Sequence, residues 1–244
     1  MISSSLFSLL DATLLKEGIT VSDIQTLVDE AENCGAAAVC IPPHFVRDAV
    51  THRQRKDLRI ATVANFPTGA EPLEDVRACV THALKEGADE IDLVFPYAHH
   101  LADKKDEVEH FVKSIRTLIP NNHGFKVILE VCAYKNSPQF LRSACAQALA
   151  CGADFLKTST GMIPYVSTPE DVAILLDAVK KHHKLSGRWT GIKISGGVRT
   201  PEQAQAYLNQ IREIMGPNWI TPHTVRFGSS TLHNTSGRVS LPSY

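Results

Sequence analysis

Three segments of the sequence share one order of parts: a helical pattern, a glycine and then an apolar run of strand length. They are NCGAAAVCIPP at 33–43, EGADEIDLVFP at 86–96 and CGADFLKTSTG at 151–161. Glycine directly after a helix adopts the left-handed backbone conformation at little cost, so each segment predicts a helix that leads straight into a strand. A chain built from this joint alternates helices and strands.

The opposite joint, from a loop into a helix, also recurs. Ser137, Thr168 and Thr200 each stand directly before a proline. A hydroxyl side chain at the N-cap and a proline in the first turn are typical of a helix N-terminus, so a helix is predicted to begin after each of them. Both joints together indicate strands and helices in regular alternation.

Eight short runs of apolar and β-branched residues are candidate strands, and helical patterns fill the gaps between them. The runs lie at 8–15, 37–41, 59–66, 90–95, 126–131, 155–159, 191–195 and 224–228. Eight strand–helix units in 244 residues predict the α/β class and a single (β/α)8 TIM barrel over 1–244, with a flexible C-terminal tail at about 234–244. A doubly wound open sheet is the alternative, which the lack of a GxGxxG motif after the first strand weakens.

Charge and hydrophobicity exclude several kinds of partner. The net charge of −1 provides no basic surface for nucleic acid or for an anionic membrane. No run reaches the roughly 18 apolar residues of a membrane span, and no positive charge precedes Lys16 as it would in a signal peptide. The six cysteines form no C-x-x-C pair, which is typical of reduced thiols in the cytosol. The predicted location is therefore the cytoplasm.

Four charged residues interrupt the apolar strands: Asp11, Asp92, Lys157 and Lys193. In a barrel of this kind the chemistry lies at the C-terminal ends of the strands. A lone lysine there usually reaches solvent at the rim, but two lysines on consecutive strands, each flanked by apolar residues, are unusual. These four residues are the candidate catalytic residues.

The two lysines are predicted to change each other's pKa. Neighbouring strands lie about 5 Å apart, where two ammonium groups repel by about 3 kcal/mol at an effective dielectric of 20, or roughly two pKa units. Burial acts in the same direction. One lysine is then a free amine that can form a Schiff base with a carbonyl, while Asp92 keeps the other protonated for proton transfer. The residues alone leave open which lysine attacks.

Glycines and hydroxyls follow the last two strands, in SGGVR at 195–199 and FGSST at 227–231. Loops after the seventh and eighth strands of barrel enzymes commonly hold a phosphate with backbone N–H groups. The alternative is that the paired glycines only form a tight turn. The candidate phosphate-binding residues are Gly196, Gly197, Arg199, Gly228, Ser229 and Ser230.

Metal and cofactor motifs are not found in the sequence. The histidine pairs at 99–100 and 182–183 lack the spacing of metal ligands, and ordinary helix or loop histidines are the simpler interpretation. HExxH, Walker and GxSxG motifs are absent. No metal and no organic cofactor is predicted.

The motifs EIDLVFPY, FLKTSTG, GIKISGGVRT and RFGSS occur in an order and spacing that resemble the deoxyribose-phosphate aldolases, a family of class I aldolases. ATVANFP and AAVCIPPHF fit the same family, so the resemblance covers nearly the whole chain. It implies a (β/α)8 lyase that reversibly cleaves 2-deoxy-D-ribose 5-phosphate into acetaldehyde and D-glyceraldehyde 3-phosphate, in deoxyribonucleotide and carbohydrate degradation. It also implies a metal-free enzyme and a homodimer.

The resemblance assigns roles to five residues. Lys157 would form the Schiff base, and Lys193 and Asp92 would move protons. Asp11, in LLDATLL, would lie near the substrate hydroxyls. The C-terminal Tyr244 would assist proton transfer from a mobile tail.

The glycines and Ser230 named above fall where the family binds phosphate, and Gly161 is a further substrate-binding candidate. One residue departs from the family pattern: many members carry a lysine directly after KTSTG, where it reaches the phosphate, and this chain has Met162. Weaker discrimination between phosphorylated and unphosphorylated substrates is expected. Cys40 is expected either to face the pocket, where an unsaturated aldehyde would alkylate it, or to pack as a core thiol.

Two other functions fit the same residues. One is a different phosphate-handling lyase that uses imine chemistry on another sugar phosphate. The other is a catalytically silent barrel that binds a sugar phosphate as a sensor. The presence of Lys157, Lys193 and Asp92 together argues against the sensor, because binding alone needs no buried proton shuttle.

Overall fold

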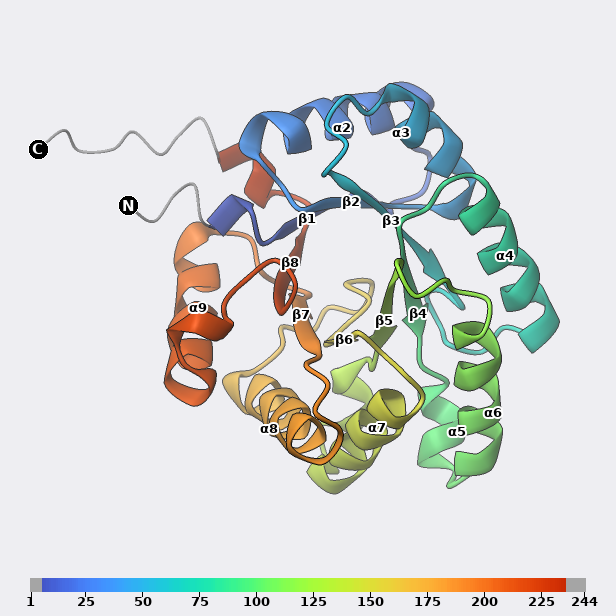
Figure 1. Ribbon diagram of the computed structural model, residues 1–244, viewed down its shortest axis with the longest axis vertical. Helices are drawn as coiled ribbons and strands as arrows, with labels where there is room; N and C mark the ends of the chain where they lie inside the picture. The colour runs from blue at the N-terminus through green and yellow to red at the C-terminus, as the bar shows by residue number, and fades with distance from the viewer. Residues whose placement is uncertain (1–5, 236–244) are drawn as a thin grey trace, which may run out of the picture.

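Each strand pairs in parallel with its neighbours in the sequence, and β8 also pairs with β1, so the sheet closes into a barrel (Figure 1). The computed structural model describes residues 6–235 of the chain. The predicted (β/α)8 TIM barrel is confirmed, and the closed ring excludes the open doubly wound sheet. The strands are β1 Leu10–Thr13, β2 Ala38–Ile41, β3 Arg59–Ala64, β4 Glu90–Val94, β5 Gly124–Ile128, β6 Phe155–Lys157, β7 Gly191–Ser195 and β8 Val225–Ser229.

Helices surround the barrel and cover its outer face (Figure 1). The α-helices are α2 Val21–Cys34, α3 Val46–His52, α4 Leu73–Lys85, α5 Tyr97–Leu101, α6 Lys105–Arg116, α7 Pro138–Ala150, α8 Pro169–Ser186 and α9 Pro201–Met215. Short 3-10 helices are η1 Pro43–Phe45, η2 Val131–Tyr134, η3 Pro217–Trp219 and η4 Leu232–Thr235. Within residues 6–235, no helix combines the length and the apolar character needed to cross a membrane.

The joints that predicted the alternation have the expected backbone geometry, with one exception. Gly35 ends α2 in the left-handed conformation, at φ 76°. Thr168 and Thr200 each form a capping box, at the start of α8 and of α9. Ser137 occupies the N-cap of α7, but its side chain makes no capping hydrogen bond, so the predicted hydroxyl cap is wrong there. Its ψ of 67° differs from the extended backbone of the two threonines, at 160° and 154°.

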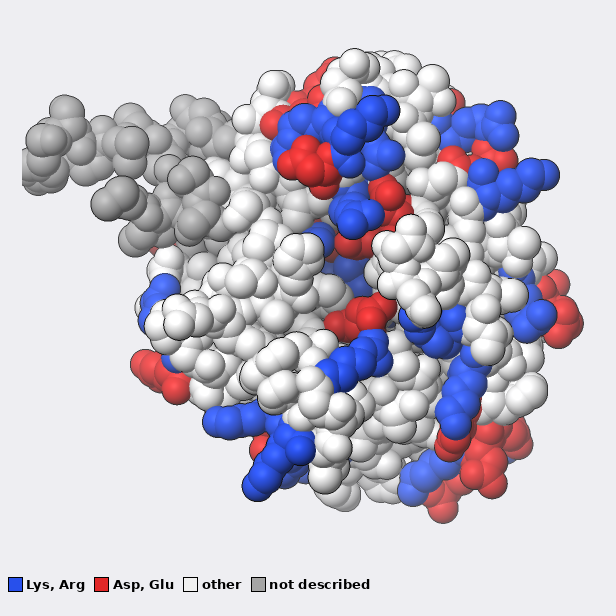
Figure 2. Space-filling view, viewed as in Figure 1, with Lys and Arg blue, Asp and Glu red and all other residues white. Residues whose placement is uncertain are grey.

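Alternation along the strands places apolar side chains outside the barrel and charged ones inside it. In β4, Ile91 and Leu93 belong to the core between the sheet and the helices. Glu90 and Asp92 alternate with them and contact Lys126 of β5 in the interior. Figure 2 shows acidic and basic side chains next to each other in the hollow at the centre of the ring. Barrel interiors are usually filled by branched apolar residues, so a charged interior indicates a functional one.

Several predicted strands run past the observed ones at their C-terminal ends. The run at 155–159 continues two residues beyond β6, and the run at 126–131 continues beyond β5. Glu130 adopts a left-handed backbone conformation, at φ 53°, and turns the chain out of the sheet. Residues 129–131 and 158–160 are nevertheless buried, which is why their sequence pattern resembles that of strands.

Candidate active site

The two predicted lysines are neighbours in the barrel. Lys157 ends β6 and pairs in register with Lys193 of β7. Both residues are buried, with 2% and 0% of their surface exposed. Asp92 Oδ2 lies 3.0 Å from Lys157 Nζ and 2.8 Å from Lys193 Nζ. The structure therefore brings together three of the four candidate catalytic residues around one carboxylate oxygen.

A second carboxylate distinguishes the two lysines. Asp11 Oδ2 lies 2.5 Å from Lys193 Nζ, whereas Lys157 forms an ion pair with Asp92 alone among the described residues. Burial lowers the pKa of Lys157, and the charge of Lys193 lowers it further. Burial also acts to lower the pKa of Lys193, but Asp11 and Asp92 outweigh it and hold that pKa well above its ordinary value. The surroundings thus favour Lys157 as the free amine.

The expectation that Asp92 would favour one lysine over the other is wrong in this respect. Asp92 contacts both ammonium groups through the same oxygen at nearly equal distances. The asymmetry comes from Asp11, a residue of β1 that reaches Lys193 across the barrel interior. This contact could not be anticipated, because β1 and β7 are not adjacent strands.

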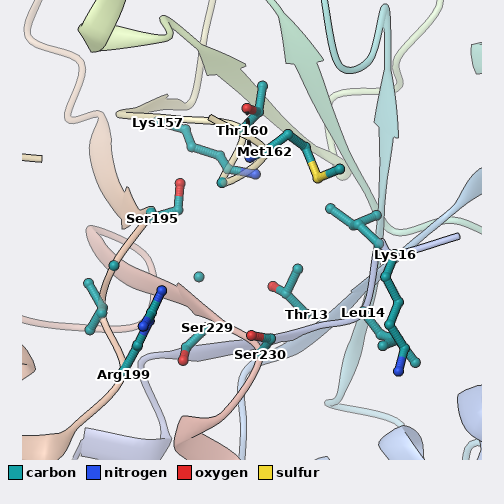
Figure 3. A pocket seen from close by; sticks show the side chains of 16 residues that line it. Thr13, Leu14, Lys16, Lys157, Thr160, Met162, Ser195, Arg199, Ser229 and Ser230 are labelled. Atoms are coloured by element: carbon teal, nitrogen blue, oxygen red, sulfur yellow. Dashed lines mark hydrogen bonds between the residues drawn. The ribbon is translucent and has the colours of Figure 1, made fainter. Parts of the chain in front are cut away.

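A cavity of about 310 Å³ opens at the C-terminal ends of β1, β6, β7 and β8 (Figure 3). Lys157 lines this cavity, while Asp11, Asp92 and Lys193 are fully buried and are not part of its wall. The place near the substrate hydroxyls that the resemblance implied for Asp11 therefore stays a prediction. The other seven predicted substrate-binding residues all line the cavity: Gly161, Gly196, Gly197, Arg199, Gly228, Ser229 and Ser230.

The paired glycines after β7 are required by the local backbone. Gly196 and Gly197 have φ angles of 81° and 91°, in the region that side chains rarely adopt. A Cβ on Gly197 would also lie 2.6 Å from Val166 Cγ2, closer than atoms can pack. The predicted tight turn is therefore present. It lies on the cavity wall, and phosphate binding by this turn stays a prediction.

A comparison with known families decides what kind of protein this is. The family model described as DeoC/LacD family aldolase matches residues 6–234, which is nearly the whole described part of the chain. The chain belongs to the DeoC/LacD aldolase family. It is therefore an aldolase, and the predicted class of enzyme, a lyase, is confirmed.

Individual proteins similar to this DeoC/LacD aldolase include one curated relative and two solved structures. The deoxyribose-phosphate aldolase of Agrobacterium fabrum (strain C58) is 40% identical over 226 residues, which are 91% of this chain and 85% of that protein. A structure from Toxoplasma gondii, provisionally named deoxyribose-phosphate aldolase, has a TM-score of 0.84 and 23% identity over 97% of this chain and 92% of its own. A deoxyribose phosphate aldolase from Aeropyrum pernix, described as a tetramer, has a TM-score of 0.75 and 23% identity over 97% and 93%. At these identities the two structures support the fold.

Sequence analysis of this DeoC/LacD aldolase missed three buried charged residues, Glu90, Lys126 and Arg226. Lys126 Nζ lies 2.7 Å from Asp92 Oδ1, and Arg226 Nη1 lies 2.6 Å from Asp11 Oδ1. A signal was present, because each of the three stands in an apolar strand at a position that alternates with outward-facing apolar residues. They do not stand out in the sequence, because glutamate, lysine and arginine are mostly exposed in proteins.

Polar cavity-lining residues were missed as well, because they lie at strand ends or in loops and the residues opposite them in the cavity are distant in sequence. The missed residues include Thr13, Lys16, Thr160 and Ser195. Figure 3 shows them around the same open space as Lys157 and Arg199. Lys16 matters most, since it adds a cation to the wall of a cavity predicted to hold a phosphate.

Three further residues were singled out in the sequence: Met162, Cys40 and Tyr244. Met162 lines the cavity and is 50% exposed. Cys40 is buried and packs against Ala61 and Val63, and its Sγ lies 3.9 Å from Asp92 Oδ2. Because Cys40 is not part of the cavity wall, the structure favours a packed core thiol over a thiol that faces the pocket. Burial raises the pKa of this thiol. Tyr244, like nearly all of the predicted tail at 234–244, lies outside the described residues.

The first histidine pair contacts neighbouring side chains of the protein. His99 contacts Glu107 on the surface, and His100 is buried between Ser143 and Tyr134. In the described part of the chain, no three potential ligands of the His, Cys, Asp or Glu type lie close enough to hold a metal ion.

Proposed function

We propose that this aldolase reversibly cleaves 2-deoxy-D-ribose 5-phosphate into acetaldehyde and D-glyceraldehyde 3-phosphate through a Schiff base on Lys157. The observation that carries the proposal is a buried lysine that lines a cavity and whose pKa is lowered by burial and by Lys193. The relative from Agrobacterium fabrum, 40% identical, carries the name of this activity.

In the proposed cycle, Lys157 Nζ attacks C1 of the open-chain sugar, and loss of water gives an iminium. The iminium accepts the electron pair of the C2–C3 bond as that bond breaks, and the C3 hydroxyl gives up its proton to become the new aldehyde. The two-carbon enamine that remains is protonated at C2. Water then releases acetaldehyde and restores the amine of Lys157.

Two groups beside Lys157 are proposed to carry the protons of this cycle. Lys193 is held protonated and lies 2.8 Å from Asp92 Oδ2, which also lies 3.0 Å from Lys157 Nζ. The ammonium of Lys193 can donate a proton to the departing water, and a carboxylate can accept one in return. Tyr244 stays a proposed participant in enamine protonation.

The phosphate is proposed to bind where the loops after β7 and β8 line the cavity. The paired glycines expose backbone there, and Ser229 and Ser230 add hydroxyl groups. Among the described residues, Arg199 and Lys16 are the cations of the wall besides Lys157. Because these two cations are present, we expect the phosphorylated sugar to bind although Met162 replaces the family lysine.

The proposed function is tested by trapping the imine. The protein is incubated with acetaldehyde and borohydride, and the intact mass is followed by peptide mapping. A single ethyl group on Lys157 is the expected result. An adduct on Lys193 would reverse the assignment of the two lysines, and the absence of a site-selective adduct would reject the Schiff-base mechanism.

Met162→Lys is expected to increase the preference for the phosphorylated sugar. The new ammonium would gain a contact with the phosphate of roughly 1–3 kcal/mol, or about ten- to a hundredfold in affinity. The ratio of kcat/KM for 2-deoxyribose 5-phosphate to kcat/KM for 2-deoxyribose should rise by that factor. Met162→Gln, which adds polarity without charge, is the matched control, and an unchanged ratio in the lysine variant would contradict the prediction.

We also propose a cellular location and an assembly for the enzyme. We place the enzyme in deoxyribonucleotide catabolism in the cytoplasm, which agrees with six unpaired cysteines. We retain the homodimer as the proposed assembly, although the relative from Aeropyrum pernix is described as a tetramer.

A further inference from the structure

A layer of seven buried charged side chains fills the barrel interior next to the cavity. We call it the charged layer. No residue of it is more than 6% exposed, and its members come from β1 and β4 to β8. The charged layer consists of Asp11, Glu90, Asp92, Lys126, Lys157, Lys193 and Arg226.

Lys126 contacts all three carboxylates of the layer. Its Nζ lies 2.5 Å from Glu90 Oε2, 2.7 Å from Asp92 Oδ1 and 3.8 Å from Asp11 Oδ2. Asp92 therefore uses Oδ1 for Lys126 and leaves Oδ2 for Lys157 and Lys193. Lys126 thus holds the Asp92 oxygen that the other two lysines do not contact.

Glu90 holds Lys126 from the other side and connects it to β8. Glu90 Oε1 lies 3.3 Å from Arg226 Nη2, and Arg226 Nη1 contacts Asp11 Oδ1 at 2.6 Å. These contacts form a chain of ion pairs from Asp92 through Lys126, Glu90 and Arg226 to Asp11. The two carboxylates that contact Lys193 are the two ends of this chain.

The charged layer contains one more basic side chain than carboxylates, so one of its bases differs from the others in its protonation. Four basic side chains face three carboxylates, so the layer is neutral only when one base has lost its proton. Lys126, Lys193 and Arg226 each contact at least two carboxylates, whereas Lys157 contacts Asp92 alone among the residues that the structure describes. Buried charge without a matching partner is costly, so Lys157 is the base that the layer leaves uncharged.

We propose that Lys126 and Glu90 are positioning residues that keep Lys157 as the free amine. Lys126 fixes the orientation of Asp92, and the opposite charges of Lys126 and Glu90 balance the layer without the proton of Lys157. The proposal rests on the proposed role of Lys157 as the nucleophile, and it goes further, because neither Lys126 nor Glu90 lines the cavity.

The charges around Lys157 predict that Lys126 and Glu90 have opposite effects on the pH at which Lys157 loses its proton. Asp92, Lys193 and Cys40 face Lys157 directly, and Asp11, Glu90, Lys126 and Arg226 complete its charged surroundings. Without the charge of Lys126, the carboxylates are in excess, and Lys157 holds its proton to higher pH. Without the charge of Glu90, the cations are in excess, and Lys157 loses its proton at lower pH.

Three variants separate this charge effect from damage to the fold: Lys126→Met, Glu90→Gln and the double variant. The titration of Lys157 is followed by its acetylation with acetic anhydride across a pH series, mapped by peptide mass spectrometry and normalised to the exposed Lys184. We expect the midpoint to rise by about one to two pH units in Lys126→Met and to fall by about as much in Glu90→Gln. In the double variant, which restores neutrality, the midpoint should return to within about half a unit of the wild type.

The matching activity measurement is the acid limb of kcat/KM with 2-deoxyribose, which has no phosphate to titrate. It should move in the same directions as the acetylation midpoints. Midpoints that do not move, or that move in the same direction in both single variants, would overturn the proposal. If Lys126→Met fails to fold, Glu90→Gln and the neutral double variant still decide it.

The test distinguishes this proposal from the proposed function. Acetylation needs no substrate, so its midpoints report on the charged layer whether or not the protein cleaves a sugar phosphate. The ethyl adduct on Lys157 reports on the Schiff base whether or not the midpoints move.

Discussion

Lys157→Met is expected to abolish both imine trapping and aldol cleavage. The variant has no amine to attack the sugar carbonyl, and the neighbouring Lys193 cannot replace it, because Asp11 and Asp92 hold Lys193 in its protonated form. Removal of a covalent nucleophile leaves only binding and proton transfer, so kcat/KM should fall by roughly 10⁴-fold or more. Initial rates with 2-deoxyribose 5-phosphate and the acetaldehyde–borohydride adduct measure the two losses.

The same variant is expected to fold at least as stably as the wild type. Three cations then face three carboxylates in the charged layer, and methionine fills most of the volume of the lysine chain. Thermal unfolding followed by circular dichroism checks this. Residual cleavage together with an ethyl adduct on Lys193 in this variant would show that Lys193 is also a nucleophile, contrary to the proposed assignment.

The fold could be predicted from the sequence because its signals are local. A glycine at the end of α2 and threonines before α8 and α9 specify where helices stop and start, and they do so within a few residues. Repetition of such joints leaves few topologies other than a closed barrel. The C-terminal ends of the strands were predicted less accurately, because residues such as Glu130 leave the sheet while they remain buried.

The candidate site could be predicted in part, because its central pair is also local to two consecutive strands. Lys157 and Lys193 each occur in a short apolar run, and parallel pairing of β6 with β7 places them side by side. The choice between them depends on Asp11, which precedes both lysines by more than 140 residues in the sequence, and on a register that only the closed barrel fixes. The deeper residues Lys126 and Arg226 were missed for the same reason, since their carboxylate partners lie on other strands.

Asp92→Asn is expected to separate imine formation from turnover. The variant removes the one carboxylate within residues 6–235 that pairs with Lys157, so the amine of Lys157 stays unprotonated and the ethyl adduct with acetaldehyde still forms. The proton relay through Lys193 loses its acceptor, and kcat for cleavage should fall by about 10²- to 10⁴-fold. Adduct formation and cleavage measured on one preparation give both results, and loss of the adduct would contradict the assigned electrostatics.

The free energy of unfolding should also depend on Asp92, and the contribution of Asp92 should decrease as the pH falls. Burial opposes the charge of Asp92, but Lys126, Lys193 and Lys157 outweigh it and hold the pKa well below its ordinary value. A depressed pKa stabilises the fold at neutral pH, and this stabilisation is lost as the pH falls through the range below about 4. Asp92→Asn should therefore lower the free energy of unfolding by about 3–5 kcal/mol at neutral pH. The difference from the wild type should narrow in acid.

Asp89→Asn is the matched control for Asp92→Asn, because it makes the same change three residues away and outside the charged layer. Asp89 pairs with Arg53 at 2.6 Å and remains partly exposed, with 21% of its side chain accessible. The control should lose some stability and keep the wild-type kcat/KM, since neither partner lines the cavity. Equal losses of activity in both variants would mean that Asp92 supports the fold rather than the proton transfers, and the relay through Lys193 would then need another acceptor.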